Sequence, residues 1–507
     1  MIGDARRRAQ LGLALVLLAA GLLRFWSLSQ GIGFNLGPDE PEVMERAVRM
    51  MKTGDLHPHF FDYPALYMYV QMAVSTARFM VGAIQGRWSS LAQAPVEDFY
   101  LWARAATALL GTATVWVLYR AGQRWGEPTA LLAAALVAVM PLHVRESHYV
   151  LTDVPVTFVV TVTFLLTLRA HERASAGSFA LAGAAAGFAA ALKYNGVFAV
   201  IMPLAGCALT WRLRPRRAVA ALAVTAAMLA AFFVAAPYTL IDLPGFLNQF
   251  ARLSSEYRKP PTIAEPIWLV YLKHLRIALG WPGMVFVGGG LALAAWRALR
   301  DRDRLRWILP LLFAVLYFRF VAQQTIVFAR YLLPVVPFLS LLAAAFIVTV
   351  AGALRRAGLR PPVRVALVVA LIALAIARPA TTAVGYDVDA AKVSTQGLAY
   401  EWIRRELPNG SGIRLEGSVT LRLPAAYRAS YAKQLWTDPP GSYAAQNVDY
   451  LVASSQCYGP FLADPAGYRV EYGAYQRLFA ETDEIARFVP SPDHPGPELR
   501  ILKVRRS

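Results

Sequence analysis

Two adjacent carboxylates, Asp39 and Glu40, stand between Pro38 and Pro41 in the stretch GIGFNLGPDEPEVMERAVRMM at residues 31–51. A fixed carboxylate is suited to take a proton from a nucleophile or to hold a metal ion. It is also suited to a structural task, because a carboxylate at the start of a helix caps backbone amides and is favoured by the helix dipole. Residues elsewhere in the chain must distinguish the two interpretations.

A second polar stretch, PLHVRESHYVLTDVPV at residues 141–156, also lies between apolar blocks. It carries His143, Arg145, Glu146, His148 and Asp153. If both stretches lie at the same membrane face, their carboxylates can supply a general base together with either a metal ion or a partner that orients the base. Asp153 precedes Pro155 at the head of an apolar block, so a capping role is open for it as well.

Three basic residues complete this set: Arg104, Lys193 in ALKYNGVF and Arg330 in FARYLLPVVPF. A single Lys or Arg at the end of a membrane helix is most often an interfacial anchor. Three of them beside an acidic site suit a phosphate or pyrophosphate near the lipid headgroups. Together these residues predict group transfer from a phosphate-bearing lipid to a neutral nucleophile.

The composition indicates a polytopic α-helical membrane protein. The chain is 57% hydrophobic and 16% charged, and its apolar residues come in blocks of roughly 17 to 25, the length of a bilayer crossing. The net charge of +19 is explained mostly by topology, because about twenty of the 51 basic residues lie in six short segments between the blocks. We therefore expect no nucleic-acid partner. Cys207 lies in an apolar block and Cys457 in the polar tail, so no disulfide is expected.

The six basic segments determine the predicted topology, because short loops rich in Lys and Arg stay in the cytoplasm. They lie at residues 6–8, 120–124, 169–173, 211–217, 296–306 and 354–364. Eleven crossings place all six inside, with the N-terminus cytoplasmic and the tail outside. The predicted crossings are residues 9–28, 101–120, 129–143, 153–169, 178–192, 194–211, 217–237, 281–297, 307–322, 330–352 and 363–380.

One apolar segment, residues 63–84, is left out of this count. A crossing there would move every later basic loop outside, and the segment carries Gln71, Ser75, Thr76 and Arg78 in its middle. We therefore predict a helix along the outer interface. Residues 41–53 are predicted to lie similarly, because their apolar and charged side chains fall on opposite faces of a helix. The first outer loop, residues 29–100, thus holds two interfacial helices behind the acidic pair.

The tail is compositionally different, so we divide the chain into a membrane domain of residues 1–385 and an extracytoplasmic domain of residues 386–507. AYEWIRREL reads as an amphipathic helix, and GIRLEG, DYLVAS and ELRILKV read as short strands among turn-rich linkers. These patterns predict a small α/β domain. It has no glycine-rich nucleotide loop, and acceptor recognition, a lid and an assembly surface are all compatible roles.

Five motifs occur in a fixed order: GPDEPEVMERA, GDLHPHFFDYPALYMY, HVRESHYVLTDVP, ALKYNGV and RYLLPVVPFLSLLAA. In this order and spacing the chain resembles the polyprenyl-phosphate-dependent glycosyltransferases of the membrane-embedded GT-C superfamily. The resemblance points to family 39, which includes protein O-mannosyltransferases, with the aminoarabinose transferases of lipid A as relatives. It covers roughly residues 10 to 380, and its specificity comes from the ordered set of motifs. It implies a GT-C fold and inverting transfer of a sugar from polyprenyl phosphate to an acceptor hydroxyl.

The resemblance also implies a role for each residue. Asp39 would be the general base and Glu40 would orient the site. Asp153 would hold the acceptor or a divalent cation. Lys193 and Arg330 would hold the donor phosphate and stabilise its negative charge as the bond to the sugar breaks.

One departure from the family pattern affects phosphate binding. Relatives often carry Lys-Pro-Pro-Leu before the second interfacial helix, where this chain has DYPAL and Tyr63 replaces the lysine. Binding would then depend more on Lys193 and Arg330, with Arg104 or Arg145. Contacts to the acceptor or to a metal have further candidates: His57, His59, His148 and Glu146. A divalent cation and a metal-independent reaction are both open, and lone histidines are most often structural.

The expected partners are a sugar-bearing polyprenyl phosphate, membrane lipids and an acceptor that is a protein, a lipid or a glycan. The expected location is the cell membrane, with the active site facing outward. A transporter or lipid flippase is the main rival, although it would place ionisable residues near the membrane midplane. An oligosaccharide transferase with a pyrophosphate-linked donor also stays open. A non-catalytic scaffold would leave the acidic and basic outer loops unexplained.

Overall fold

The computed structural model describes residues 2–37, 39–211, 214–258, 265–417, 419 and 421–505. The chain divides into two compact units. The first consists of Met1–Leu28 and Glu42–Tyr386, and the second of Ser29–Pro41 and Asp387–Ser507. The short segment that follows the first long helix, and carries the acidic pair, therefore groups with the C-terminal part of the chain.

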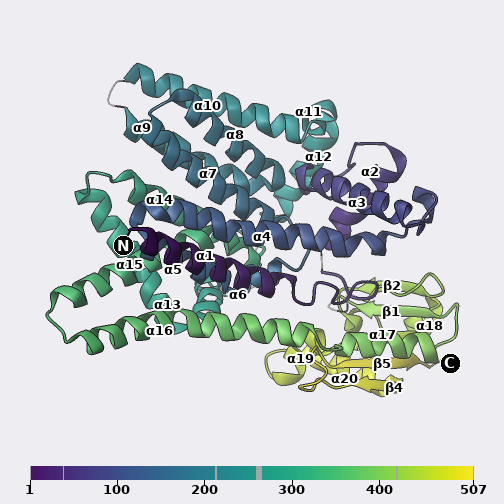
Figure 1. The fold of residues 1–507 in the computed structure, drawn as a ribbon. Coiled ribbons are helices and arrows are strands. Elements are labelled where there is room, and N and C mark those ends of the chain that lie inside the picture. The colour runs from purple at the N-terminus through teal and green to yellow at the C-terminus, as the bar shows by residue number, and fades with distance from the viewer. Residues whose placement is uncertain are drawn as a thin grey trace. The chain divides into compact units, whose positions relative to one another are not determined.

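Seven helices among the described residues are long and apolar enough to cross a membrane, judged by length and composition. A helix satisfies its own backbone hydrogen bonds, so such segments can lie in lipid without exposing unpaired amides. The protein is thus a helical polytopic membrane protein (Figure 1). The seven are α1 (Ile2–Phe25), α4 (Tyr100–Gly122), α7 (Asp153–Arg173), α10 (Arg214–Ala235), α13 (Ile267–Arg300), α15 (Val336–Arg356) and α16 (Pro361–Ala390).

The other four predicted crossings coincide with shorter helices. They are α5 (Glu127–Ala138), α8 (Ala176–Leu192), α9 (Ile201–Thr210) and α14 (Leu305–Val321), with 12, 17, 10 and 17 residues. The predicted segment 129–143 is divided because α5 ends before Pro141, where the short α6 (Pro141–Glu146) begins. Since these four helices are shorter than the seven candidate spans, the count of eleven crossings stays a prediction.

Helix packing in the first unit places two connections that matter for function. Helix α8 packs against both α7 and α10, and the 3₁₀ segment η4 (Tyr194–Val200) follows α8 directly. A second 3₁₀ segment, η5 (Ala329–Val335), precedes α15 and also contacts α7. The N-terminus of α7 therefore lies near both 3₁₀ segments, η4 and η5.

The segment of residues 29–100 contains α2 (Glu40–Thr53) and α3 (Leu66–Ile84). The polar residues in the middle of α3 are buried against protein: Gln71 donates to the hydroxyl of Tyr67 at 2.8 Å, and the Arg78 guanidinium lies 4.7 Å from the Trp88 ring centroid. Helix α3 is not among the seven candidate spans. Its placement along the interface stays a prediction.

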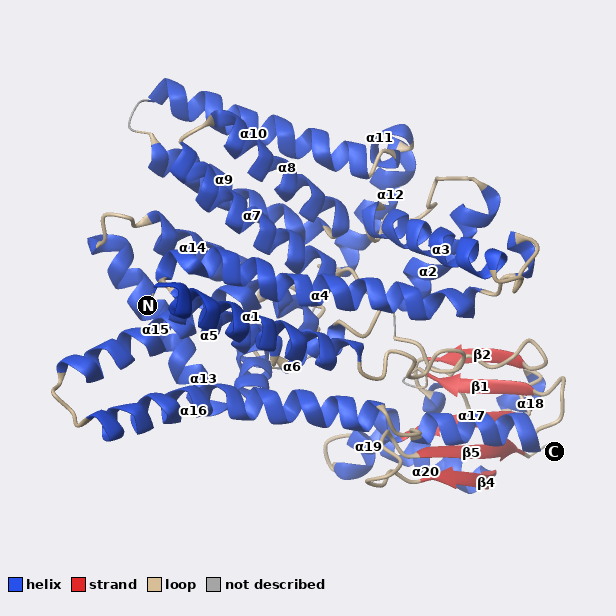
Figure 2. Ribbon diagram, viewed as in Figure 1, coloured by secondary structure: helices blue, strands red, loops and turns tan. Residues whose placement is uncertain are grey.

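The second unit contains a five-stranded mixed sheet of order β2-β1-β3-β5-β4 (Figure 2). Strand β1 pairs in parallel with β2 and β3, whereas β5 pairs antiparallel with β3 and β4. The predicted strands at GIRLEG, DYLVAS and ELRILKV are present as β1, β3 and β5, and β2 and β4 were not predicted. The strands are β1 (Gly412–Glu416), β2 (Arg428–Ala432), β3 (Tyr450–Ser454), β4 (Thr482–Phe488) and β5 (Leu499–Val504).

Helices cover both faces of this sheet. Ile413 of β1 and Ile501 of β5 pack with α17 (Thr395–Glu406), whose Ile403 is fully buried. The opposite face buries Leu451 and Leu502 against α19 (Ser455–Ala463) and α20 (Arg469–Glu481). Alternation along each strand sends neighbouring apolar side chains to opposite faces, which is why one sheet supports two cores. The second unit is thus an α/β domain, as the sequence predicts.

The segment 29–41 joins this α/β unit through backbone contacts. Asn35 forms an isolated antiparallel bridge with Leu421, and the Arg422 amide donates to the Phe34 carbonyl at 2.8 Å. The rings of Phe34 and Tyr400 are 5.4 Å apart. The acidic pair, Asp39 and Glu40, lies near the end of this segment.

Candidate active site

Three ionisable side chains meet within the first unit. Lys193 Nζ lies 2.6 Å from Asp153 Oδ1, and Arg330 Nε lies 3.7 Å from Asp153 Oδ2. Their side chains are only 10%, 4% and 11% exposed, in the order Lys193, Asp153 and Arg330. Each carboxylate oxygen therefore faces one cation, in a region largely removed from solvent.

Local backbone geometry brings these residues together. Asp153 is the first residue of α7, Lys193 lies in an extended conformation immediately after α8, and Arg330 belongs to η5. The turn after Lys193 requires Gly196, because a Cβ atom there would lie 2.1 Å from the Ala189 carbonyl oxygen. A larger residue would therefore clash with the backbone at the glycine position of the motif ALKYNGV.

The structure decides against the capping interpretation of Asp153. Among the described residues its carboxylate contacts Lys193 and Arg330 rather than the amides of the first turn of α7. Taking three charged groups out of water costs several kcal/mol for each ion, and mutual pairing is what offsets that cost. A buried cluster of this kind suggests a task beyond stability.

Aromatic rings surround the cations. Lys193 Nζ lies 4.6 Å from the Tyr331 ring centroid, and the Arg330 guanidinium lies 4.2 Å from the Phe328 ring. The hydroxyl of Tyr331 is 2.8 Å from that of Tyr257. Rings oriented in this way hold cations in place by cation–π attraction.

A cavity of about 470 Å³ opens beside Lys193. Its walls come from the first outer loop, from η4, from α12 (Leu243–Glu256) and from the end of α14. The lining includes Tyr63, Tyr257 and Arg258 as well as apolar side chains such as Phe250 and Leu253. A largely apolar cavity with a few charged groups at one side is suited to an amphipathic ligand.

Residues 57–62 contact α12 and the residue that caps it. The His57 Nε2 atom is 3.0 Å from Asp242 Oδ2, and the Phe61 amide donates to Gln249 Oε1 at 3.0 Å. Arg252 pairs with Asp62 at 2.7 Å. These contacts form one wall of the cavity from two segments far apart in the sequence.

The two histidines of this loop have structural partners. His57 Nδ1 accepts from the backbone amide of His59 at 2.7 Å, so its Nε2 carries the hydrogen that faces Asp242. His59 Nε2 is 2.9 Å from Asp55. Hydrogen bonds from the His57 amide and the His59 ring hold the pKa of Asp55 below its ordinary value.

Polar side chains of residues 141–156 also have hydrogen-bond and ion-pair partners within the protein. Both ring nitrogens of the buried His148 face backbone carbonyls, Val144 O at 2.9 Å and Trp26 O at 2.8 Å. Arg145 pairs with the buried carboxylate of Glu146. The fully buried Arg104 donates to Leu28 O at 2.8 Å.

The acidic pair lies in the second unit. Glu40 is the first residue of α2, and its Oε2 atom accepts from the Gly37 amide at 2.7 Å. The Gly37 amide precedes α2, so this hydrogen bond does not cap the first turn of the helix, and Asp39 directly precedes the helix. Within the described part of the chain, no three His, Cys, Asp or Glu side chains are grouped closely enough to hold a metal ion.

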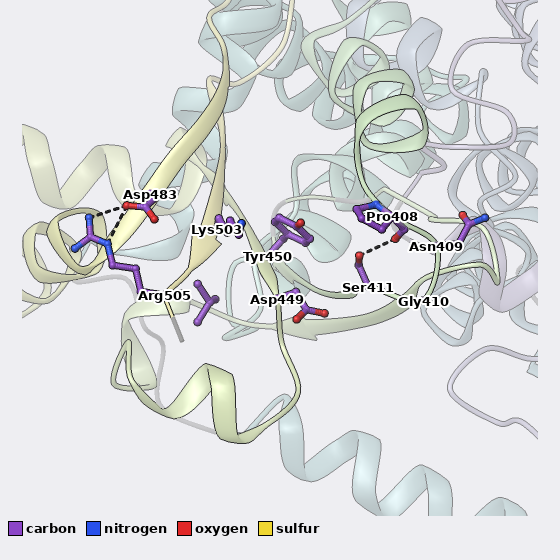
Figure 3. Close-up of a pocket in the computed structure, with 10 residues that line it drawn as sticks. Pro408, Asn409, Gly410, Ser411, Asp449, Tyr450, Asp483, Lys503 and Arg505 are labelled. Carbon is purple, nitrogen blue, oxygen red and sulfur yellow. Dashed lines mark hydrogen bonds and ion pairs between the residues drawn. The ribbon is translucent and has the colours of Figure 1, made fainter. Parts of the chain in front are cut away.

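A second hollow, of about 810 Å³, lies in the α/β unit at the start of β1 and β3 (Figure 3). Three of its charged groups have partners within the domain: Arg505 pairs with Asp483 at 2.8 Å, and Asp449 accepts from the Gly412 amide at 2.8 Å. The first cavity therefore remains the better candidate for catalysis.

Sequence reasoning missed α12 and with it Tyr257 and Arg258. The signal was present: Asp242 caps the helix by accepting from the Gly245 amide, and Pro244 follows at the second helical position. Apolar residues then recur at helical spacing through Leu243, Leu247 and Phe250. This pattern predicts an amphipathic helix, although not its position beside Lys193.

The fold of this chain is similar to the folds of known membrane glycosyltransferases. The fold is similar to that of the oligosaccharyltransferase AglB from Archaeoglobus fulgidus in complex with an inhibitory peptide and a dolichol-phosphate, with a TM-score of 0.60, 14% identity and coverage of 97% of this chain and 74% of that one. It is also similar to that of ArnT from Cupriavidus metallidurans bound to undecaprenyl phosphate, with a TM-score of 0.52, 16% identity and 98% of each chain covered. No curated protein sequence matches the chain.

The helical membrane unit with its C-terminal sheet domain thus has the fold of the GT-C membrane glycosyltransferases. Residues 44–252 match the model of the family described as dolichyl-phosphate-mannose-protein mannosyltransferase. A match to this family indicates a polyprenyl-phosphate-dependent glycosyltransferase. The family predicted from the ordered motifs is confirmed.

Proposed function

We propose that the protein transfers a sugar from a polyprenyl-phosphate donor to an acceptor hydroxyl at the outer face of the membrane, with inversion of the anomeric centre. The observation that supports this most is the cluster of Lys193, Asp153 and Arg330 beside an aromatic-lined cavity. Lys193 lines this largely apolar cavity, and Arg330 contacts the same carboxylate as Lys193 does. A cationic group in an apolar cavity suits a phosphate that carries a long hydrocarbon chain.

In the proposed reaction Asp39 takes the proton from the acceptor hydroxyl. The acceptor oxygen forms a bond to the anomeric carbon while the bond from that carbon to the phosphate oxygen breaks, and the electron pair leaves with the phosphate. Lys193 and Arg330 stabilise the negative charge that develops on the leaving phosphate. The products are the glycosylated acceptor and polyprenyl phosphate, and Glu40 orients the site.

The remaining candidates receive supporting roles. Arg104 and His148 are buried and engaged with backbone carbonyls, and we assign them to positioning the outer loops. The more exposed Arg145, whose side chain is 45% accessible, keeps a secondary role in phosphate binding, with Glu146 as its partner. His57 and His59 fasten the wall of the cavity.

The wider assignment of the chain follows the sequence prediction. Residues 1–385 form the catalytic membrane domain with eleven crossings, and residues 386–507 form an extracytoplasmic domain that contributes to acceptor recognition. The basic segments of the loops support this orientation. A divalent cation at Asp153 is not needed for charge balance, since two cations already face this carboxylate.

An oligosaccharide transferase with a pyrophosphate-linked donor is the second candidate. The likeness in fold to the oligosaccharyltransferase AglB supports transfer of an oligosaccharide, although that structure holds a dolichol-phosphate. Both candidates use the same bond changes and differ in the number of phosphates in the donor.

Incubation of the purified full-length protein with polyprenyl-phosphate sugars tests the proposal. The assay follows release of polyprenyl phosphate, and release of polyprenyl pyrophosphate from matched pyrophosphate-linked donors tested in parallel. Release from monophosphate donors that requires an acceptor supports the first candidate, and release only from pyrophosphate donors supports the second. A protein that binds these lipids without breaking the sugar–phosphate bond would overturn both.

A further inference from the structure

The carboxylate of Asp153 lies between the two cations of the proposed phosphate site and lowers the net charge of that site. One of its oxygens faces Lys193 and the other faces Arg330. Counted with their ordinary charges, the three side chains have a net charge of +1 in place of the +2 that the cations alone would have. Their burial makes this difference matter, because screening by water and salt is weak away from solvent.

The reaction changes the charge of the lipid. A sugar–phosphate–lipid donor is a phosphodiester with one negative charge. The lipid product is a phosphate monoester, which carries roughly 1.5 to 2 negative charges at pH 7. A site with a net charge of +2 would therefore favour the product over the donor more strongly than a site with +1.

We propose that Asp153 is a specificity-determining residue that lowers the affinity of the Lys193–Arg330 pair for the phosphate-monoester product relative to the phosphodiester donor, and so favours product release. The inference rests on the proposed function of this site. It differs from a role in holding acceptor or metal, because both carboxylate oxygens already face cations. The same contacts make Asp153 poorly suited to act as a base.

The carboxylate between the two cations affects both the stabilisation of the developing phosphate charge and the release of the product. The cations must stabilise the charge that develops on the phosphate, since only interactions that strengthen toward the transition state accelerate the reaction. A product held too tightly would then limit turnover at the release step. A carboxylate fixed between the cations reduces the second effect while leaving both cations in place.

Two matched probes test the inference without any sugar: farnesyl phosphate, a monoester, and farnesyl methyl phosphate, a diester with the same chain. Their dissociation constants are measured on the full-length protein in detergent by calorimetry. In Asp153→Asn, which keeps the shape, the preference for the monoester over the diester should rise about tenfold, as expected for one unit charge near the ligand at intermediate dielectric. An unchanged preference would overturn the inference.

A charge series keeps the test decisive if Asp153→Asn leaves the cations unpaired and fails to fold. Lys193→Met lowers the net charge of the cluster to zero and should shift the preference toward the diester. The double variant Asp153→Asn/Lys193→Met restores +1 and should return the preference to that of the wild type, although both probes bind more weakly. A preference that does not follow the net charge across this series would reject the role of Asp153.

Glu172→Gln is the matched control. Glu172 lies near the other end of the same helix, about 28 Å from Asp153 at the helical rise, and pairs with Arg124. Removal of this carboxylate should leave the preference unchanged, and an equal effect there would show that the response is not local. If the wild type binds neither probe, the proposed phosphate site itself fails, which is a different result from an unchanged preference.

Discussion

Lys193 Nζ and Asp153 Oδ1 are 2.6 Å apart although 40 residues separate them in the chain. Asp153 begins α7 and Lys193 follows α8, and these two helices pack against each other. An antiparallel helical hairpin returns the chain to the face where it began. The ion pair is therefore a direct result of two consecutive helices of similar length.

Loss of either cation should weaken binding of the donor. In Lys193→Met and Arg330→Met we expect the donor dissociation constant to rise by about ten- to a hundredfold, because a charge-assisted contact contributes about 1.5 to 3 kcal/mol. Equilibrium binding of a polyprenyl-phosphate sugar measures the effect, with Arg120→Met as a control distant in sequence. Wild-type affinity in both variants would make these residues interfacial anchors.

Asp39→Asn separates catalysis from helix capping. Asparagine caps a helix about as well as aspartate but cannot act as a base, so turnover should fall by roughly 10²-fold or more while thermal stability stays near that of the wild type. Glu40→Gln should have a milder effect on turnover. Transfer assays and melting curves on the same preparations provide the measurement. A well-folded Asp39→Asn protein with full activity would show that Asp39 is not the general base.

Cysteine labelling tests the orientation. Ser90 and Gly441 are exposed, and a Cβ atom at Gly441 would meet nothing within 4 Å. In a Cys457→Ser background we expect Ser90→Cys and Gly441→Cys both to react with an impermeant thiol reagent in intact cells, because the eleven-crossing topology places both outside. Protection of position 90 with labelling at 441 would contradict the eleven-crossing topology.

Asp242 should couple the first outer loop to α12. Asp242→Ala removes both the helix cap and the contact with His57, and we expect it to lower stability by about 1 to 2 kcal/mol. Asp242→Asn keeps an acceptor for the cap and should cost less. Thermal unfolding gives the ranking, and an Ala variant as stable as the wild type would show that this contact does not stabilise the cavity wall.

The sequence alone determined the membrane class, the family and most helices. Apolar blocks and basic loops reflect the energetics of lipid and need no tertiary contact to be recognised. The strands at residues 412–416, 450–454 and 499–504 were also predicted, because their apolar residues are continuous or alternate. Strands β2 and β4 were missed because their exposed residues lack that pattern.

Only the tertiary structure decided which candidate residues meet. Asp153 could have been a helix cap by its position before Pro155, yet two cations from η5 and from the connection after α8 occupy its carboxylate. Arg104 and Arg145 looked equivalent to Lys193 in the sequence, but packing engaged them with Leu28 and Glu146. Side-chain pairing depends on contacts between distant segments, which local spacing does not encode, so the sequence supplied the candidates and the packing of helices selected among them.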